Sequence, residues 1–323
     1  MQRSGFPLFD WFPALRELPR VELCTLPSPL QPLDHILAEL WIKRDDLNAP
    51  VCGGNKVRAL EFLLGGLREG DSVVTVGGSG STHILATALH AARIGVSTYA
   101  LRWRHEMNPV ANEVSSKIDS IVERSSIHLT PIVPVARARL KAIAGKSRYI
   151  PVGGSVPLGV LGHVNSALEL VAQIEAGEMP PPSRVVLPIG TGGTAAGLLL
   201  GFAIAGVDIE VVGVRTGPRM FANKRAVLAL ARRTARFIGT LCGERIPPAD
   251  PNRLRVIHSA YGGAYGRPVE GAAQATADLH EAIGIRLDDT YTAKAWIGAV
   301  RERDRAPGPL LYWFTFDASC LTS

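Results

Sequence analysis

The strongest constraint on the fold of this 323-residue chain is a pattern that occurs twice: an apolar strand, a glycine-rich loop, a helix and a second strand. The predicted elements of the first unit are residues 72–76, 77–81, 82–93 and 97–102, and those of the second are residues 185–187, 190–193, 194–205 and 209–214. This rhythm is typical of a mainly parallel sheet covered by helices, so the sequence predicts an α/β fold. Ligands bind such sheets beyond the carboxyl ends of the strands, where both glycine loops fall.

One segment of this pattern is long enough to cross a bilayer, because residues 185–207 contain no charged side chain. The same segment contains Pro188 and six glycines, which a buried strand, a glycine loop and a buried helix explain better. The first 20 residues lack the continuous apolar stretch of a signal peptide. We therefore expect a soluble, cytoplasmic protein with no membrane partner.

The chain carries a formal net charge of +6, and its densest basic runs are residues 102–105 and 232–236. We interpret these runs as solvated helix faces with a mild preference for anionic ligands, and not as a nucleic-acid site. The four cysteines are far apart and form no C-x-x-C pair: Cys24, Cys52, Cys242 and Cys320. We expect no metal site, free thiols in a reducing compartment, and Cys52 as a small buried apolar residue.

The run Gly53-Gly54-Asn55-Lys56 places a lysine at the start of a helix predicted over residues 56–67. The positive end of the helix dipole lowers the pKa of a lysine at this position. A neutral amine is what Schiff-base chemistry requires. The alternative interpretation is an ordinary surface lysine near a helix N-terminus.

The run Gly190-Thr191-Gly192-Gly193-Thr194 lies between an apolar strand and a helix, where backbone N–H groups can cradle an anion. With Ala195 it also fits G-x-G-x-x-A, a pattern typical of dinucleotide sites. The acidic residue at the expected distance, Glu210, begins the next predicted strand, whereas a ribose-binding acid should lie at its end. The sequence therefore favours a monophosphate site, with a structural glycine turn as the alternative.

The other glycine loop carries Ser79, Ser81 and Thr82, whose hydroxyls can cap the following helix. The same hydroxyls and the nearby amides can bind a carboxylate, and the two roles are compatible. His83 has no partner visible in the sequence, and we predict a packed helix residue and not a catalytic base.

In this order, the motifs resemble the pyridoxal 5′-phosphate (PLP)-dependent family of 1-aminocyclopropane-1-carboxylate deaminase and D-cysteine desulfhydrase. The resemblance spans residues 40–315 and is carried by both glycine loops and by four further runs: Lys43-Arg44-Asp45-Asp46, Gly53-Gly54-Asn55-Lys56-Val57-Arg58, Gly153-Gly154-Ser155-Val156-Pro157-Leu158-Gly159 and Leu287-Asp288-Asp289-Thr290-Tyr291-Thr292-Ala293-Lys294-Ala295. It implies the tryptophan synthase β-like fold, called fold type II, with PLP between two open, twisted, mainly parallel-sheet α/β domains. On this basis residues 1–52 and 165–323 form the large cofactor-anchoring domain, and residues 53–164 form the small domain.

The resemblance also implies a role for individual residues. Lys56 would form the Schiff base with PLP and move the Cα proton of a small amino-acid substrate. Ser81 and its neighbours would bind the substrate carboxylate, and Tyr265 and Tyr291 would face the substrate side of the cofactor ring. Thr315 matches a threonine near the pyridine nitrogen. The cofactor-binding residues implied in this way are Lys56, Asn55, Thr82, Gly190, Thr191, Gly192, Gly193, Thr194 and Thr315. The resemblance also suggests a homodimer.

Three departures from the family pattern bear on cofactor affinity and substrate. Asparagine is usual at the position of Thr82, a second lysine is usual at the position of Ala59, and His-Thr-Gly-Gly is usual where residues 314–317 read Phe-Thr-Phe-Asp. Loss of a charge-assisted phosphate contact costs about 1.5–3 kcal/mol unless another group replaces it.

Position 292 bears on the type of reaction. The ring-opening deaminases resemble one another in carrying glutamate there, and threonine, as in this chain, is similar to the desulfhydrases. We therefore expect α,β-elimination from a small amino acid, with release of ammonia and a 2-oxo acid. The alternatives are ring opening, β-replacement, a non-catalytic protein that binds PLP or an amino acid, and, from the Gly190 loop alone, an NAD(P)-dependent oxidoreductase.

Overall fold

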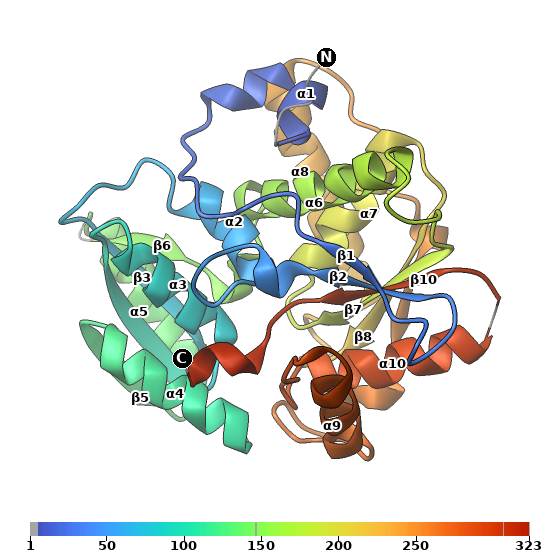
Figure 1. The fold of residues 1–323 in the computed structure, drawn as a ribbon. Helices are drawn as coiled ribbons and strands as arrows, with labels where there is room; N and C mark the ends of the chain where they lie inside the picture. The colour runs from blue at the N-terminus through green and yellow to red at the C-terminus, as the bar shows by residue number, and fades with distance from the viewer. Residues whose placement is uncertain (1–5, 146, 306, 323) are drawn as a thin grey trace.

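The computed structural model describes residues 6–145, 147–305 and 307–322, and within them two separate sheets are formed (Figure 1). The larger sheet has the strand order β1-β2-β10-β7-β8-β9, with bounds β1 Leu30–Pro32, β2 Leu40–Arg44, β10 Leu310–Phe314, β7 Arg184–Ile189, β8 Glu210–Arg215 and β9 Leu254–Ile257. The smaller sheet has the order β5-β4-β3-β6, with bounds β5 Arg124–His128, β4 Ser97–Trp103, β3 Ser72–Gly78 and β6 Arg148–Ile150. Every pair of neighbouring strands is parallel except β1 with β2.

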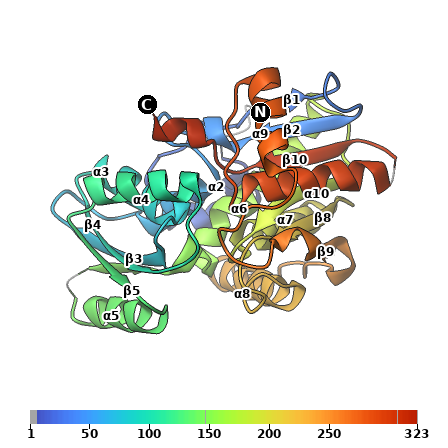
Figure 2. The same ribbon diagram turned by 90° about the horizontal axis from the view of Figure 1, so that it is seen from below.

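Helices cover both sheets, with bounds α1 Leu8–Trp11, α2 Asn55–Leu63, α3 Thr82–Ala92, α4 Pro109–Ile121, α5 Ile132–Ile143, α6 Pro157–Glu175, α7 Gly193–Ala205, α8 Lys224–Cys242, α9 Ala272–Ile283 and α10 Thr292–Arg305. In the larger sheet, Val185 and Leu187 of β7 pack toward α6, α7 and α8, whereas Val186 packs toward α9 and α10. Successive side chains of a strand point to opposite faces, so a sheet covered on both faces requires the continuous apolar run seen in β7. Figure 2 shows the same arrangement in the smaller sheet, with α5 on one face and α3 and α4 on the other.

The structure confirms the α/β fold and both strand–loop–helix–strand units. The uncharged segment is the buried strand β7, a glycine loop and the buried helix α7, as predicted. Two element boundaries differ from the prediction. Helix α2 ends at Leu63, before Gly65 and Gly66, and β3 continues through Gly77 and Gly78, which the sequence analysis assigned to a loop.

The prediction of four free thiols is wrong for one pair. Cys52 and Cys320 form a disulfide, with Cα atoms 5.3 Å apart, and Cys24 and Cys242 are free. The two bonded residues are 268 positions apart in sequence, and the fold brings the segment after β10 beside the loop that precedes α2.

The interpretation of residues 102–105 as a solvated helix face is also wrong. These residues lie at the end of β4 and beyond it, and Arg102 is 1% exposed. Its guanidinium donates to Ser115 Oγ at 2.9 Å and pairs with Asp119. The other basic run, residues 232–236, does lie on a helix, α8, where Arg232, Arg233 and Arg236 are not buried.

The domain boundaries inferred from the resemblance remain a prediction. In the part of the chain that the structure describes, no helix combines the length and apolarity needed to cross a membrane.

Candidate active site

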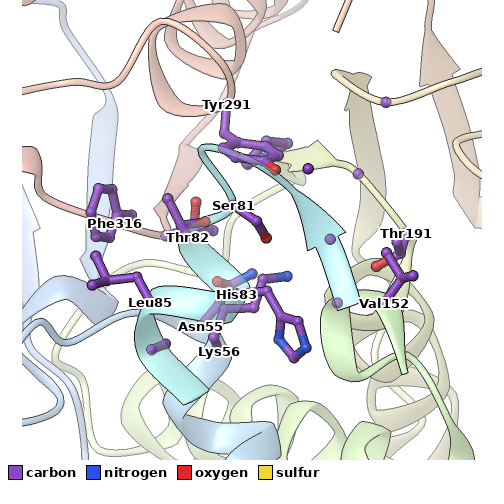
Figure 3. Close-up of a pocket in the computed structure, with 18 of the residues that line it drawn as sticks. Asn55, Lys56, Ser81, Thr82, His83, Leu85, Val152, Thr191, Tyr291 and Phe316 are labelled. Atoms are coloured by element: carbon purple, nitrogen blue, oxygen red, sulfur yellow. The ribbon is translucent and has the colours of Figure 1, made fainter. Parts of the chain in front are cut away.

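A cavity lies between the two sheets, and the chain segments that follow several of the parallel strands line it. Nine of the residues singled out in the sequence line this cavity together: Asn55, Lys56, Ser81, Thr82, Gly190, Thr191, Tyr265, Tyr291 and Thr315. In Figure 3, Lys56 and Tyr291 lie on opposite sides of the cavity, with Ser81 and Thr82 between them. Parallel strands align their carboxyl ends, and this brings residues from distant parts of the chain into one site.

Lys56 lies in the first turn of α2 and is partly buried in the cavity wall. The turn before it is held by Asn48, whose side chain accepts from Gly54 N at 3.0 Å and donates to Gly54 O at 3.1 Å. Desolvation by burial lowers the pKa of Lys56 to about 8. The predicted lowering is therefore present, but its cause is burial, which disfavours the charged form, and not the helix dipole that the sequence suggested.

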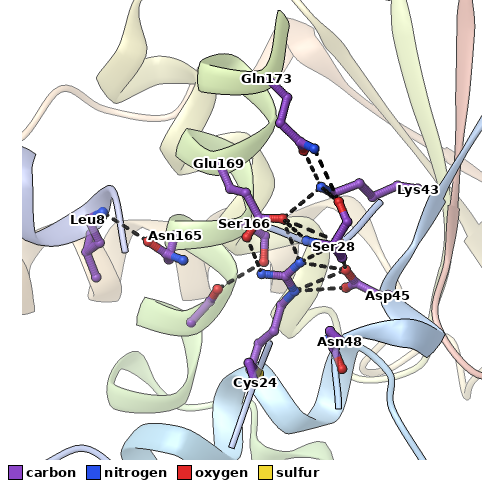
Figure 4. Close-up of polar contacts among 12 residues, drawn as sticks. Leu8, Cys24, Ser28, Lys43, Asp45, Asn48, Asn165, Ser166, Glu169 and Gln173 are labelled. Atoms are coloured by element: carbon purple, nitrogen blue, oxygen red, sulfur yellow. Dashed lines mark hydrogen bonds and ion pairs between the residues drawn. The ribbon is translucent and has the colours of Figure 1, made fainter. Parts of the chain in front are cut away.

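The same helix directs Arg58 away from the cavity, into a buried ion cluster formed by Lys43, Asp45, Arg58 and Glu169 (Figure 4). Arg58 donates to Asp45 at 2.7 Å and to Glu169 at 2.9 Å, and Lys43 donates to Glu169 at 2.7 Å. All four side chains are at most 3% exposed. The cluster therefore fixes the start of α2 relative to β2 and α6, and it explains the charged residues of the run that begins at Lys43.

The loop at Gly190 has the features of an anion site. Gly192 adopts φ 83°, a left-handed conformation that favours glycine, and it precedes the first turn of α7. The unpaired N–H groups of that turn are directed out of the helix N-terminus. Two neighbouring hydroxyls are held in place, because Asn55 Nδ2 donates to Thr194 Oγ1 at 2.8 Å and the Ser155 and Thr191 hydroxyls are 2.6 Å apart. Gly190 and Thr191 line the cavity, whereas Gly192, Gly193 and Thr194 lie behind them.

The loop at Ser81 lies across the cavity from the tyrosines. Ser81 caps α3, since its hydroxyl accepts from Ile84 N at 3.4 Å. The predicted capping role is confirmed, and the carboxylate-binding role remains a prediction. His83 is 4% exposed and lies 3.2 Å from Thr75 Oγ1, and burial is the main cause that lowers its pKa to about 3. A neutral, packed histidine agrees with the prediction for this residue.

Tyr265 and Tyr291 form a hydrogen-bonded pair through their hydroxyl groups. Burial raises the pKa of Tyr265 to about 12, and that of Tyr291 is also raised, so both carry their protons near neutrality. Asp288 positions Tyr291 by accepting from its backbone N–H at 2.7 Å. Thr292 donates its hydroxyl to Asp288 at 2.8 Å and does not line the cavity.

The end of β10 closes another side of the cavity. Thr315 is 4% exposed, and its carbonyl accepts from Asn55 N at 3.2 Å. Phe316 and Cys52, which lie beside it, also line the cavity. The departure at position 59 is visible as well, since Ala59 packs in an apolar cluster with Leu60 and Leu63.

Two residues of this site were missed in the sequence analysis. Ser155 was quoted only as part of a motif, and its contact with Thr191 depends on the fold. His105 was counted in a basic run, yet it lines the cavity and packs against Tyr265. No spacing rule identifies either residue, because both contacts join separate strand–helix units.

The family model described as pyridoxal-phosphate dependent enzyme matches residues 21–312, and the chain belongs to this family. It is similar to nocardicin C-9′ epimerase of Nocardia uniformis subsp. tsuyamanensis, at 35% identity over 92% of each chain. It is also similar to D-cysteine desulfhydrase of Salmonella typhi, at 32% identity over 95% of this chain and 96% of the relative.

Solved structures agree with this assignment. A structure described as a homologue of ACC deaminase superposes with a TM-score of 0.77 at 28% identity and covers 98% of this chain and 95% of that one. A threonine deaminase, whose source is given as T.th., shares the fold, with a TM-score of 0.61 at 21% identity over 96% of both chains. The protein is therefore a PLP-dependent enzyme of fold type II in the group of ACC deaminase and D-cysteine desulfhydrase.

The residues present fit this cofactor. The Gly190 loop supplies amides for a phosphate, and a Cβ atom added at Gly193 would lie only 2.8 Å from Ser155 Oγ, so the loop has no room for a side chain there. Lys56 supplies an amine in the same cavity, and burial alone accounts for the shift of its pKa. A cation without a carboxylate partner suits a group that must react as a neutral amine.

Proposed function

We propose that the protein catalyses α,β-elimination from a small amino acid, releasing ammonia and a 2-oxo acid, as the name of its relative D-cysteine desulfhydrase suggests. The observation that carries the proposal is Lys56, a partly buried lysine with a lowered pKa, which faces the anion loop and the tyrosine pair in one cavity. PLP, when bound, withdraws electrons from the substrate Cα and acidifies its proton.

In this proposal each part of the cavity has one task. Asn55 and residues 190–194 hold the cofactor, and Ser81 with Thr82 binds the substrate carboxylate. The Lys56 amine takes up the Cα proton on one side. On the other side, the Tyr265 and Tyr291 hydroxyls orient the substrate or hold a proton for exchange.

Two further residues favour elimination over ring opening. Thr315 offers a hydroxyl where a carboxylate would favour protonation of the pyridine nitrogen, and elimination requires less stabilisation of the carbanion. Thr292 stands where the ring-opening deaminases carry glutamate, and its hydroxyl is engaged with Asp288.

The direct test begins with the absorbance spectrum of the purified protein, before and after borohydride. Reduction should fix the cofactor to the peptide that contains Lys56, and labelling of Lys43 or Lys294 would overturn the assignment. One enantiomer of β-chloroalanine or cysteine should then give pyruvate, whereas 1-aminocyclopropane-1-carboxylate should give little 2-oxobutyrate. Efficient ring opening without elimination would reverse the proposed order.

A second candidate, epimerisation at an amino-acid Cα, is favoured by one observation. The tyrosine pair lies across the cavity from Lys56, so two groups able to exchange protons occupy opposite sides (Figure 3). The relative with 35% identity is named an epimerase. Epimerisation predicts that one enantiomer of a substrate without a leaving group, such as alanine, is converted to the other. Pyruvate formation without any change of configuration would support elimination alone.

A further inference from the structure

We propose that His105 is a positioning residue that holds the carboxylate-binding loop and the Tyr265–Tyr291 pair in register across the cavity. His105 follows β4 of the smaller sheet, whereas the tyrosines lie among the segments around the larger sheet. This inference rests on the proposed function, because it takes the Ser81 loop as the carboxylate site and the tyrosines as the groups opposite Lys56.

The first support is the hydrogen bonding of the imidazole. His105 Nε2 accepts from Gly80 N at 3.1 Å, and Nδ1 lies 2.7 Å from the carbonyl oxygen of Glu106. A carbonyl oxygen can only accept, so the proton is on Nδ1 and the imidazole is neutral. Burial lowers the pKa of His105, which favours the same neutral form.

The second support is the way this contact orders the loop. Trp103 O accepts from Ser79 N at 3.0 Å and His105 accepts from Gly80 N, so two residues at the end of β4 and beyond it engage two successive loop amides. Ser81 N is engaged by Gly78 O at 3.1 Å. The amides left for an anion are those of the first turn of α3, beginning at Thr82. His105 thereby determines which N–H groups of the loop can receive a substrate carboxylate.

The third support is the packing of the ring against the opposite wall. The His105 and Tyr265 rings meet edge to face, with centroids 4.7 Å apart, and Tyr265 is bonded in turn to Tyr291. A Cβ atom added at Gly78 would lie 2.6 Å from His105 Cδ2, so the glycine provides the space that the ring occupies.

The chain on either side of these rings is tied to the same wall. Asn108 Nδ2 donates to Gly266 O at 2.8 Å, and the Arg267 guanidinium donates to Glu106 at 3.0 Å. Three residues of the segment 105–108 therefore contact three successive residues, Tyr265 to Arg267. The position of Tyr265 over the cavity is consequently fixed from the segment that also fixes the carboxylate loop.

Two substitutions separate the two contacts. His105→Phe keeps a ring against Tyr265 but removes the acceptor of Gly80 N–H. His105→Gln keeps an acceptor at the position of Nε2 but removes the ring. The probe is alanine, in the enantiomer that changes the absorbance of the bound cofactor, with alaninamide as the matched ligand that lacks the carboxylate.

For His105→Phe we expect the Kd of alanine to rise about tenfold, with a much smaller change for alaninamide. Amide hydrogen exchange across residues 77–83 should also accelerate. For His105→Gln we expect Kd within about twofold of the unsubstituted enzyme, and a fall of about tenfold in the rate at which bound alanine exchanges its Cα hydrogen with D₂O.

Equal losses of binding and exchange in both variants, or no change in either, would overturn the positioning role. Hydrogen exchange at Cα accompanies both elimination and epimerisation, so the test does not depend on which reaction the enzyme completes. If the cofactor is not on Lys56, alanine will give no absorbance change in the unsubstituted protein. That result would count against the proposed function instead.

Discussion

Two lysines near the start of the chain occupy opposite kinds of buried surroundings. Lys43 is fully buried and contacts Glu169, Gln173 and the Ser28 carbonyl, in the ion cluster that also contains Arg58. Lys56 enters the cavity, and burial alone accounts for the shift of its pKa. Arg58 and Lys56 are two residues apart on α2, so a single turn of helix separates a neutralised cluster from a reactive amine.

The difference shows how the fold keeps an amine available for chemistry. Breaking a buried ion pair is costly because it leaves a charge without a partner, so the cluster fixes α2 firmly. A carboxylate beside Lys56 would stabilise the ammonium form and raise its pKa, which would suppress Schiff-base formation. The cavity instead offers the amides of the Gly190 loop, and we expect the phosphate of the cofactor to supply the negative charge.

The largest effect should come from removing the reactive amine. For Lys56→Ala we expect activity to fall by at least about 10³-fold, since both the Schiff base and the proton-transfer group are lost. Stability without cofactor should change little, because the amine has no carboxylate partner to leave behind. Activity is measured by release of pyruvate and stability by urea denaturation, with Lys224→Ala, at the first residue of α8, as the control.

The converse change removes the central anion of the cluster. Glu169→Ala leaves Lys43 and Arg58 without their shared carboxylate, so we expect the free energy of unfolding to fall by about 3–5 kcal/mol. Urea denaturation measures the change, and Glu281→Ala, at an exposed position of α9, is the matched control. If both glutamate variants lost the same stability, the contrast between the cluster and the cavity would disappear.

A third change adds an anion to the cavity side. Gly192→Asp and Gly192→Asn impose the same strain at φ 83°, but only aspartate places a negative charge beside the proposed phosphate site. We expect the Kd of PLP to be about 10- to 100-fold higher for aspartate than for asparagine. Retention of PLP after dialysis, followed by absorbance, gives the comparison. Equal retention in two folded variants would move the phosphate elsewhere.

The smallest effect is on the pH dependence of stability, where the two regions should act at opposite ends of the scale. Arg58 and Lys43 outweigh burial and lower the pKa of Glu169 to about 2, so its contribution is present above its unfolded value near 4.3 and is lost as pH falls toward 2. The pKa of Lys56 is lowered to about 8, and the unfolded chain binds the proton more tightly. Stability of the cofactor-free protein should therefore rise between about pH 8 and 10.4.

Difference curves isolate these two contributions. The unsubstituted protein minus Lys56→Met should show the rise above pH 8, and the unsubstituted protein minus Glu169→Gln should show the loss below pH 4. Lys294 is a necessary control, because burial also lowers its pKa to about 8. A rise that disappears in Lys294→Met and persists in Lys56→Met would assign the titration to the wrong lysine.

Much of the architecture could be predicted from local sequence. Alternation of apolar strands, glycine loops and amphipathic helices identified both α/β units, since these patterns depend on contacts within about 30 residues. The position of Glu210 at the start of β8, where it pairs with Arg255 at 2.9 Å, agrees with the rejection of a dinucleotide site. The order of the motifs also placed Lys56, Ser81, Tyr265 and Tyr291 in one family pattern, and they share one cavity.

The tertiary structure alone decided the surroundings of these groups. The disulfide between Cys52 and Cys320, the hydrogen bond between His105 and Gly80, and the sharing of Glu169 by Lys43 and Arg58 each join segments that no local pattern connects. Desolvation is equally non-local, because the pKa of Lys56 depends on the groups that exclude water from the cavity and not on its neighbours along the helix. The sequence by itself therefore determined which residues carry the chemistry, and folding decided which of them are paired, which are neutral and which one is left free to react.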